Sequence, residues 1–400
     1  MKEIDIPTKI FNINAYIAIF LLFVVAGGSL PFMFYPRFFL FSFFVFSFLT
    51  RITSRVKLRW TSQYNYLLWL LFFMIISSLY NNSYDQHYKR ILFVGFVSYV
   101  LLGSFTLPRF KHLYLDVVTI FCVVSLVIFS ASLIVPLPLR YNYGDNVATG
   151  YFLFHAIEWN NHPLLRNASI YNEPGCFQYF LNYILLLHIE DLLQHRLKTN
   201  AIVKLVIVVI ALLTCASTTG YFVLIAIITY ILLNMKIKNK LVYFFFICPI
   251  AIFTFWNLYN SDSIKGKFET DNENTSFVMR AADAYAMIQM ISDHPIIGNG
   301  GVSTSTYIKR VQGYGALTPD SAPTNGILVG VASMGFFWLF IFFFYSLKAI
   351  KKMFFYVPHW LVLILILLIH SNEHYIFFPI TYVFLAFYHH NHNDNIPQKG

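Results

Sequence analysis

The chain has 400 residues, of which 58% are hydrophobic and only 12% carry a charge. A soluble globular domain carries about 25% charged residues, so this composition excludes that class and indicates a membrane protein. The formal net charge of +10 would suit a nucleic-acid-binding protein. The basic residues, however, lie in short blocks between hydrophobic runs, which is the pattern of membrane topology, and we expect no nucleic acid partner.

Apolar runs of near-spanning length recur from end to end and predict one integral membrane domain over residues 1–400, beginning with a retained signal anchor. Lipid-facing segments must satisfy their own backbone hydrogen bonds, and the alternation of an outer-membrane barrel is absent. The expected fold class is therefore all-α, a polytopic helical membrane protein with about 12 transmembrane helices. The expected spans are residues 12–29, 32–49, 64–80, 91–107, 113–135, 174–190, 200–216, 219–235, 241–258, 325–347, 358–371 and 375–389.

The connectors between these spans alternate in charge. Basic blocks follow every even-numbered span, namely "RITSRVKLR", "PRFKH", "HRLK", "KIKNK" and "KAIKK". The positive-inside rule places these connectors, and with them both chain termini, in the cytoplasm. The odd-numbered connectors then lie outside, and two of them are long, residues 136–173 and 259–324. Long loops in a compact membrane protein are usually functional, so we expect the activity in these two.

Within the second long loop, "TSFVMRAADAYAMIQMISDHP" predicts an amphipathic helix that could lie on the membrane surface as a lid. Arg280 falls off its apolar stripe. The following "HPIIGNGG" predicts a tight turn. Its backbone N–H groups either meet an anion or simply close the turn, and the sequence leaves both readings open.

The outer loops contain the residues suited to chemistry. Arginines there run against the positive-inside bias, and the planar guanidinium suits phosphate recognition; Arg140, Arg166 and Arg280 are the candidates. Their alternative roles are solvated loop charge and contact with lipid headgroups.

Glu173 lies in "NASIYNEPGCFQYF", where the first long loop meets the sixth span. Pro174 suits the first turn of a helix, which places Glu173 at the helix N-terminus. There the macrodipole stabilises an anion by about 0.3–1 kcal/mol. Glu173 is therefore either a helix cap or a functional carboxylate.

Nothing in the sequence points to a metal site or another cofactor. The four cysteines, Cys122, Cys176, Cys215 and Cys248, are scattered in or beside apolar segments without metal-ligand or disulfide spacing. The "HHNH" near the C-terminus lies in an expected cytoplasmic tail.

Four segments in order carry a family resemblance. They are "RNASIYNEPGCFQYFLNYILL", "CASTTGYFVLIAI", "RAADAYAMIQMISDHPIIGNGG" and "PTNGILVGVASMGFFWLF". With the hydropathy profile, they make residues 160–347 resemble the O-antigen polymerases (Wzy type), within the superfamily shared with the O-antigen ligases. The resemblance implies a metal-independent glycosyltransferase of lipopolysaccharide biosynthesis in the bacterial inner membrane, with its active site facing the periplasm. Its implied partners are undecaprenyl-diphosphate-linked oligosaccharide, membrane lipid and, optionally, a chain-length regulator protein.

The resemblance also implies roles for individual residues. By position, Arg166 and Arg280 match the loop arginines that handle anionic substrates, and Arg140 matches less well, although the family's arginine-to-glycine spacing is not met. Asn325 opens the span after the second loop and is assigned to substrate binding. Ligases usually carry histidine just before this asparagine, whereas this chain has Thr324, which favours a polymerase.

The chemistry of the donor assigns the remaining roles. Undecaprenyl diphosphate is already a good leaving group, so the enzyme must supply charge stabilisation and a base for the acceptor hydroxyl. Glu173 is the first candidate for the base and His294 the second. An O-antigen ligase and a lipid-linked oligosaccharide flippase remain the alternatives.

Overall fold

The computed structural model describes residues 6–26, 29–54, 62–82, 86–135, 139–143, 146–151, 153–159, 162–234, 276–300, 325–371 and 381–386. The chain divides into two compact units, and each is described by itself. Unit 1 comprises Met1–Val117, Met287–Thr304 and Asn325–Gly400, and unit 2 comprises Val118–Ala286 and Ser305–Thr324.

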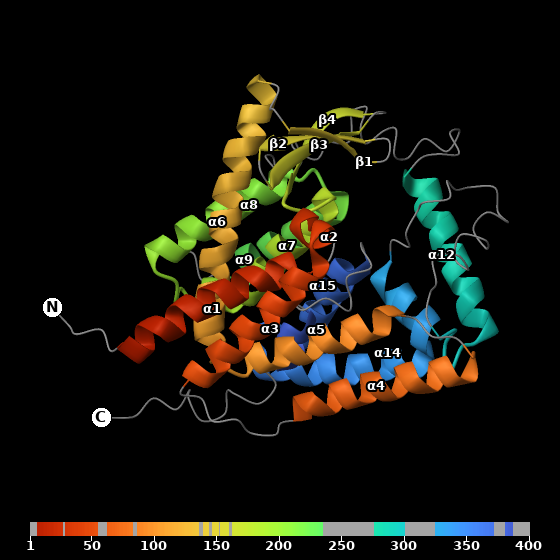
Figure 1. The fold of residues 1–400 in the computed structure, drawn as a ribbon. Helices are drawn as coiled ribbons and strands as arrows, with labels where there is room; N and C mark the ends of the chain where they lie inside the picture. The colour runs from red at the N-terminus through yellow and green to blue at the C-terminus, as the bar shows by residue number, and fades with distance from the viewer. Residues whose placement is uncertain are drawn as a thin grey trace. The chain divides into compact units, whose positions relative to one another are not determined.

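The described part of unit 1 is helical (Figure 1). Its helices are α1 (Ile6–Val24), α2 (Leu30–Phe34), α3 (Pro36–Thr53), α4 (Ser62–Tyr80), α5 (Gln86–Leu102), the first part of α6 (Leu107–Ile134), α14 (Gly326–Met353), α15 (His359–Ser371) and α16 (Thr381–Ala386). Helix α3 packs against α1 and α5, and α14 packs against α4 and α15. Local sequence sets the starts of these helices: the Ser29 hydroxyl caps α2, and Pro36 occupies the first turn of α3.

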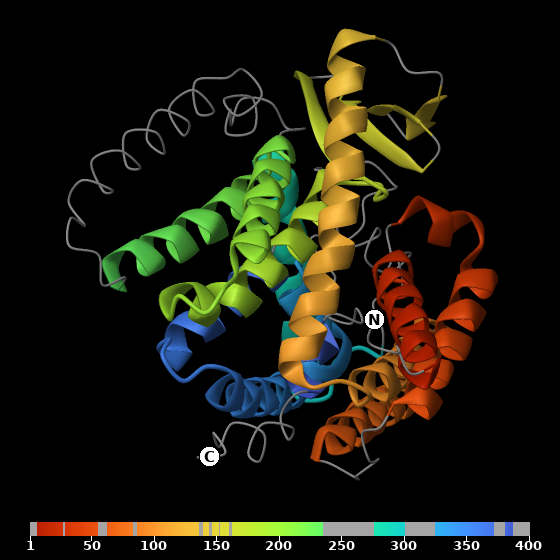
Figure 2. The same ribbon diagram turned by 90° about the vertical axis from the view of Figure 1, so that its left-hand side faces the viewer.

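Unit 2 contains the rest of α6, a β-sheet and three helices that pack together, α7 (Pro174–Leu193), α8 (Thr199–Thr214) and α9 (Thr218–Asn234), which are green in Figure 2. The N-terminal part of α12 (Ser276–Asp293) also belongs to it. Helix α7 is buried without interruption from Pro174 to Glu190, because α8, α9 and the last strand of the sheet cover it. A helix that is apolar all round takes such a central position.

The prediction of a helical membrane protein is confirmed in outline. Every expected span except the ninth, residues 241–258, falls on a described helix, and that one lies outside the described residues, as does most of the twelfth. By length and composition, the helices α3, α6 and α14 are able to cross a membrane. Five more apolar helices are shorter: Ile10–Val24, Asn65–Tyr80, Thr199–Thr214, Thr218–Asn234 and His359–Ser371. The number of spans and the topology remain predictions.

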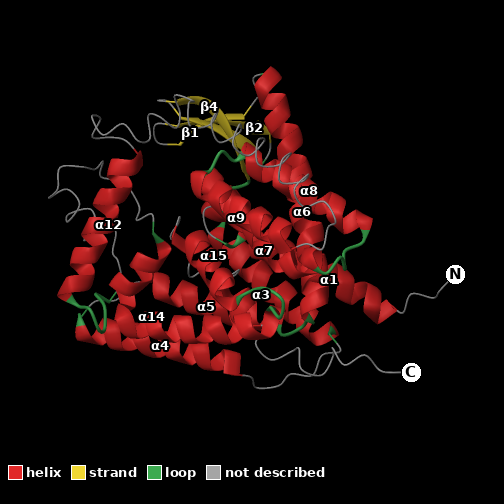
Figure 3. Cartoon of the chain, turned by 180° about the vertical axis from the view of Figure 1, so that it is seen from behind, coloured by secondary structure: helices red, strands yellow, loops and turns green. Residues whose placement is uncertain are grey.

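The first long loop contains a β-sheet that the sequence analysis did not predict (yellow in Figure 3). Four strands form an antiparallel meander: β1 (Leu139–Tyr143), β2 (Asn146–Tyr151), β3 (Phe154–Trp159) and β4 (His162–Ser169). Only two residues separate β1 from β2 and β3 from β4, a spacing that is typical of tight hairpins. This hairpin signal was present in a loop that the expected all-α class left without secondary structure.

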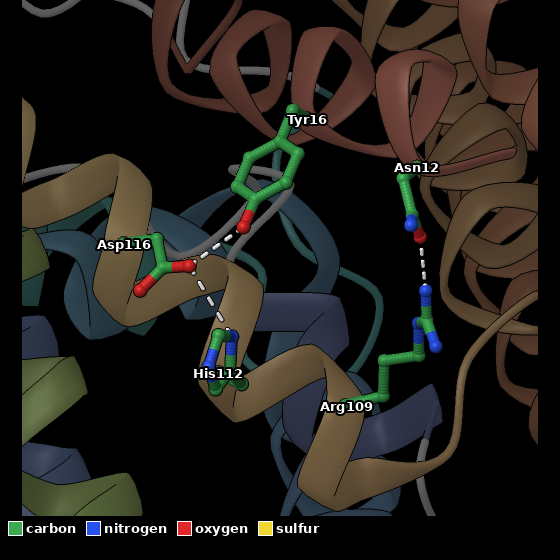
Figure 4. A network of polar contacts seen from close by, with 5 residues as sticks. All are labelled: Asn12, Tyr16, Arg109, His112 and Asp116. Atoms are coloured by element: carbon green, nitrogen blue, oxygen red, sulfur yellow. Dashed lines mark hydrogen bonds and ion pairs between the residues drawn. The ribbon is translucent and has the colours of Figure 1, made fainter. Parts of the chain in front are cut away.

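Polar contacts in unit 1 join the N-terminal halves of α1 and α6 (Figure 4). The Tyr16 hydroxyl donates to Asp116 Oδ2 at 2.6 Å, and His112 Nδ1 lies 3.2 Å from the same oxygen. One turn earlier, the Arg109 guanidinium donates to Asn12 Oδ1. Residue numbers rise together along both helices, so α1 and α6 run in the same direction.

Helix α14 is broken at Gly335, where φ is 79° and ψ is 175°. The segment after α12 lies against the break. Asn299 N donates to Ala332 O at 2.8 Å, Gly300 N to Ser333 O at 3.2 Å, and Phe336 N to Pro295 O at 2.8 Å. These bonds replace the helical bonds that the break removes.

Helix α4 completes the support of this break. The Ser77 hydroxyl donates to Ser333 O at 2.8 Å and accepts from Gly300 N at 2.7 Å, and Asn81 Nδ2 donates to Gly298 O at 2.8 Å. Irregular backbone inside a membrane protein is tolerated where neighbouring polar groups satisfy it. The backbone N–H groups of residues 298–300, within "IIGNGG", all donate to carbonyls of the protein, and Gly298 N donates to His294 O. The structure therefore supports a plain turn over an anion site.

Gly335→Ala is expected to destabilise the protein. A Cβ atom at this position would lie 2.0 Å from Ile296 O, and the backbone conformation alone costs a residue other than glycine about 1–3 kcal/mol. We expect a lower melting temperature in detergent and a lower yield of monodisperse protein. Gly103→Ala is the control, because its nearest contact would be 3.1 Å at an ordinary φ. A Gly335→Ala protein as stable as the wild type would contradict this account.

Candidate functional site

Arg166 is a half-buried cation in unit 2. It lies on β4 opposite Ile157 of β3, and its Nε donates to the Cys215 carbonyl at 3.1 Å. Although the residue keeps some solvent exposure, burial of the charged group lowers the pKa of Arg166 from its ordinary value. The Cys215 thiol, Glu173 and Tyr221 act in the opposite direction, and Arg280 adds to the lowering. The guanidinium therefore depends on nearby dipoles and an anion to remain buried.

The electrostatic neighbours of Arg166 define a cluster, which we name the arginine cluster: Arg166, Glu173 and Arg280. Glu173 stabilises the charge of Arg166, and Arg280 opposes it. Arg280 lies on α12 and is exposed, whereas Glu173 is partly exposed. The cluster carries two positive charges and one negative charge. Its excess positive charge suits an anion that approaches Arg166 and Arg280 together.

Glu173 begins α7 as its N-cap residue, with an extended backbone at φ −140° and ψ 142°. Its carbonyl accepts from Cys176 N at 3.1 Å, but its side chain makes no capping hydrogen bond. Pro174 follows at the first helical position, where its missing N–H costs nothing. The Glu173 carboxylate therefore interacts electrostatically with Arg166 and does not cap the helix.

Packing fixes the short segment between β4 and α7. The ring of Tyr171 is buried and stacks on Phe180 at 5.2 Å between centroids and 17° between planes. Asn167 is buried too, and its Nδ2 donates to Ser125 Oγ at 3.2 Å and to Thr214 Oγ1 at 3.0 Å. These contacts tie β4 to α6 and α8. They hold Arg166 and Glu173 on a short, rigid piece of chain.

A buried polar pair lies on α7 below Glu173. Asn182 Nδ2 donates to Gln178 Oε1 at 2.6 Å, and both side chains are almost completely buried. Gly220 of α9 approaches Gln178 so closely that a Cβ atom would lie 2.8 Å from its Oε1. Polar residues inside an apolar span are a functional signal that the sequence analysis passed over, as it passed over Tyr221.

The other predicted site residues are His294, Asn325 and Arg140. His294 belongs to unit 1, follows α12, and presents its ring edge-on to Tyr80 at 5.7 Å. Asn325 also belongs to unit 1 and caps α14, where its Oδ1 accepts from Ile327 N and Leu328 N, each at 3.1 Å. The backbone of Arg140 pairs with Thr149 between β1 and β2, and its side chain lies outside what the structure describes.

Metal ligands do not gather in the described ranges. Among those residues, no group of three His, Cys, Asp or Glu side chains is placed to hold a metal ion. Cys122, Cys176 and Cys215 are buried free thiols, and Cys248 lies outside the described residues.

Comparison with known proteins gives one match. Residues 203–343, about a third of the chain, match the family model described as O-antigen ligase. This match confirms the resemblance to the O-antigen ligase and polymerase superfamily, whose members are membrane glycosyltransferase-like enzymes of polysaccharide biosynthesis. It includes Cys215, Tyr221 and Arg280 but not Arg166 or Glu173. No curated protein and no solved structure matches the chain significantly.

Acid should destabilise the protein through His155 on β3. This side chain is buried, and its Nδ1 lies 3.5 Å from Leu153 O. Burial lowers the pKa of His155 to about 4, although hydrogen bonds with the backbones of Leu153 and Tyr171 act in the opposite direction. Between pH 6.5 and 4 the unfolded chain binds a proton at His155 and the folded protein does not. Stability is therefore complete above pH 6.5 and falls by an amount on the order of 3 kcal/mol as the pH approaches 4.

Thermal unfolding in detergent at pH 7 and at pH 4.5 measures this effect. His155→Asn should lose part of the acid sensitivity, because asparagine does not titrate. Equal sensitivity of the wild type and His155→Asn would assign the effect to other groups.

Proposed function

We propose that the chain is a polymerase of O-antigen or a related surface polysaccharide, which joins undecaprenyl-diphosphate-linked oligosaccharide repeat units at the periplasmic face of the inner membrane. The observation that carries the proposal is the arginine cluster, in which Arg166, fixed by its bond to the Cys215 carbonyl, is attracted by Glu173 and repelled by Arg280. The match to the O-antigen ligase family over residues 203–343 supports the reaction class. Thr324, where ligases usually carry histidine, favours the polymerase.

The arginines suit the departing group. In the transfer, the bond between the anomeric carbon of the growing glycan and the diphosphate oxygen breaks, and undecaprenyl diphosphate leaves with the electron pair. Arg166 and Arg280 stabilise the negative charge that develops on this oxygen. Burial strengthens the contribution of Arg166, because charges interact more strongly where little water screens them.

Glu173 suits the attacking group. The hydroxyl of the acceptor sugar forms the new bond to the anomeric carbon, and its proton passes to the Glu173 carboxylate. In the free protein Glu173 stabilises Arg166. A bound diphosphate competes for the same guanidinium and brings negative charge close to Glu173, which favours proton uptake there. Donor binding thus makes Glu173 a better base at the moment when one is required.

An O-antigen ligase is the second candidate, because the matched family carries that description. It would use the same donor and differ in the acceptor, the lipid A-core. A flippase would need no base and no arginine pair for a leaving group.

Deletion of the gene in its own bacterium tests the function. A polymerase deletion should leave lipopolysaccharide core capped with a single repeat unit, because a ligase can still transfer one unit. Gel analysis of lipopolysaccharide reads the outcome. Core without any O-antigen, together with accumulated lipid-linked polymer, would identify a ligase, and repeat units trapped on the cytoplasmic leaflet would identify a flippase.

Glu173→Gln tests the proposed base. Glutamine keeps the size of the side chain but cannot take up the proton, so polymer formation should fall by about 10²–10⁴-fold at a normal protein level. Because the side chain makes no capping bond, the fold should be little affected. Glu190→Gln, the same change at the other end of α7, is the matched control. Near-normal polymer from Glu173→Gln would remove Glu173 from catalysis and direct the search to His294.

A further inference from the structure

The turn between α8 and α9, residues 215–217, holds the Arg166 side chain. The Cys215 carbonyl accepts from Arg166 Nε at 3.1 Å, and the neighbouring Thr214 Oγ1 accepts from Asn167 Nδ2 at 3.0 Å. Two consecutive residues of β4 therefore bind two consecutive residues at the end of α8. The conformation of this turn decides where the Arg166 guanidinium lies.

Tyr221 fixes the conformation of the turn from the other side. Its hydroxyl donates to the Leu213 carbonyl at 2.6 Å, across the whole connector. Leu213 O is one of the last carbonyls of α8, which have no full helical partner, and its bond from Ala216 N is long at 3.4 Å. Ala216 adopts a positive φ of 47°, an unfavourable conformation for a residue with a Cβ atom. The tyrosine bond stabilises the turn in that conformation.

We propose that Tyr221 is a positioning residue for Arg166: by locking the 215–217 turn, it aims the guanidinium at the diphosphate of the lipid-linked donor. This inference rests on the proposed function, which makes Arg166 a ligand of that diphosphate. It adds a residue that acts through Arg166 and needs no contact with the reacting atoms.

The need for such a device follows from the charges of the arginine cluster. Arg280 repels Arg166, and Glu173 attracts it. A guanidinium free to rotate would take several orientations, and an anion that needs it in one of them would bind less tightly. The bond from Nε to the Cys215 carbonyl opposes this movement by fixing one edge of the planar group.

Tyr221→Phe removes the hydroxyl and keeps the ring. The experiment uses the full chain in detergent or nanodiscs and measures binding of undecaprenyl diphosphate and steady-state polymerisation with a lipid-linked repeat unit. We expect about fivefold weaker binding and a KM raised by a similar factor with a smaller change in kcat, since one hydrogen bond contributes about 1 kcal/mol. Tyr230→Phe, nine residues further along α9, is the control and should match the wild type.

A double-mutant cycle separates positioning from general stability. Lysine has no Nε–H group, so Arg166→Lys loses the bond to the Cys215 carbonyl and the turn no longer positions a guanidinium. Adding Tyr221→Phe to Arg166→Lys should therefore change binding by less than about 1.5-fold, whereas a stability defect would add in full. If Tyr221→Phe protein is poorly folded, Thr214→Ala, which removes the Asn167 contact to the same turn, should give the same pattern.

The outcomes distinguish this inference from the proposed function. Wild-type binding by Tyr221→Phe, or additive losses in the cycle, would overturn the positioning role while wild-type polymerisation still stands. Weaker, non-additive binding of undecaprenyl diphosphate by a protein that forms no polymer would support positioning and overturn the polymerase reading.

Discussion

The half-buried positive charge of Arg166 is the constraint on which unit 2 depends. A guanidinium that loses part of its hydration must be compensated by dipoles and anions nearby, and this compensation comes from the Cys215 carbonyl and Glu173. The carbonyl requires the turn between α8 and α9, and the carboxylate requires α7 to begin at residue 174. Asn167 and Tyr171 then fasten the connecting chain to the helices. The position of the Arg166 charge, the turn between α8 and α9 and the start of α7 therefore depend on one another.

Unit 1 meets a related constraint in its backbone. The break at Gly335 leaves carbonyl and N–H groups of α14 without helical partners, and the segment at residues 295–300 supplies them together with Ser77 and Asn81 of α4. Glycine is required there because a Cβ atom would collide with Ile296 O. In both units, polar groups distant in sequence bind groups that lack a regular partner.

The helices were predictable because hydropathy is a local property, and the described helices follow the expected spans. The sheet at residues 139–169 was not predicted, although only two residues separate β1 from β2 and β3 from β4, because composition and hydropathy indicate an all-α class. Arg166, Glu173 and Arg280 were named from loop position and residue chemistry. The electrostatic interaction of Arg166 with Arg280, more than 100 residues further along the chain, was not predictable, since it depends on the fold. The proposed role of Tyr221 was not predictable for the same reason, because Tyr221 acts through the 215–217 turn, which binds Arg166 of β4.

The family match ends inside the arginine cluster. Arg280 and the turn that holds Arg166 lie inside residues 203–343, whereas Arg166 and Glu173 lie outside this range. The proposed function gives both arginines the same task, so the proposed site extends beyond the matched residues. The hydrogen bond from Arg166 Nε to the Cys215 carbonyl crosses the edge of the match and ties β4 to the matched part of the chain. The edge of the match is therefore not an edge in the fold of unit 2.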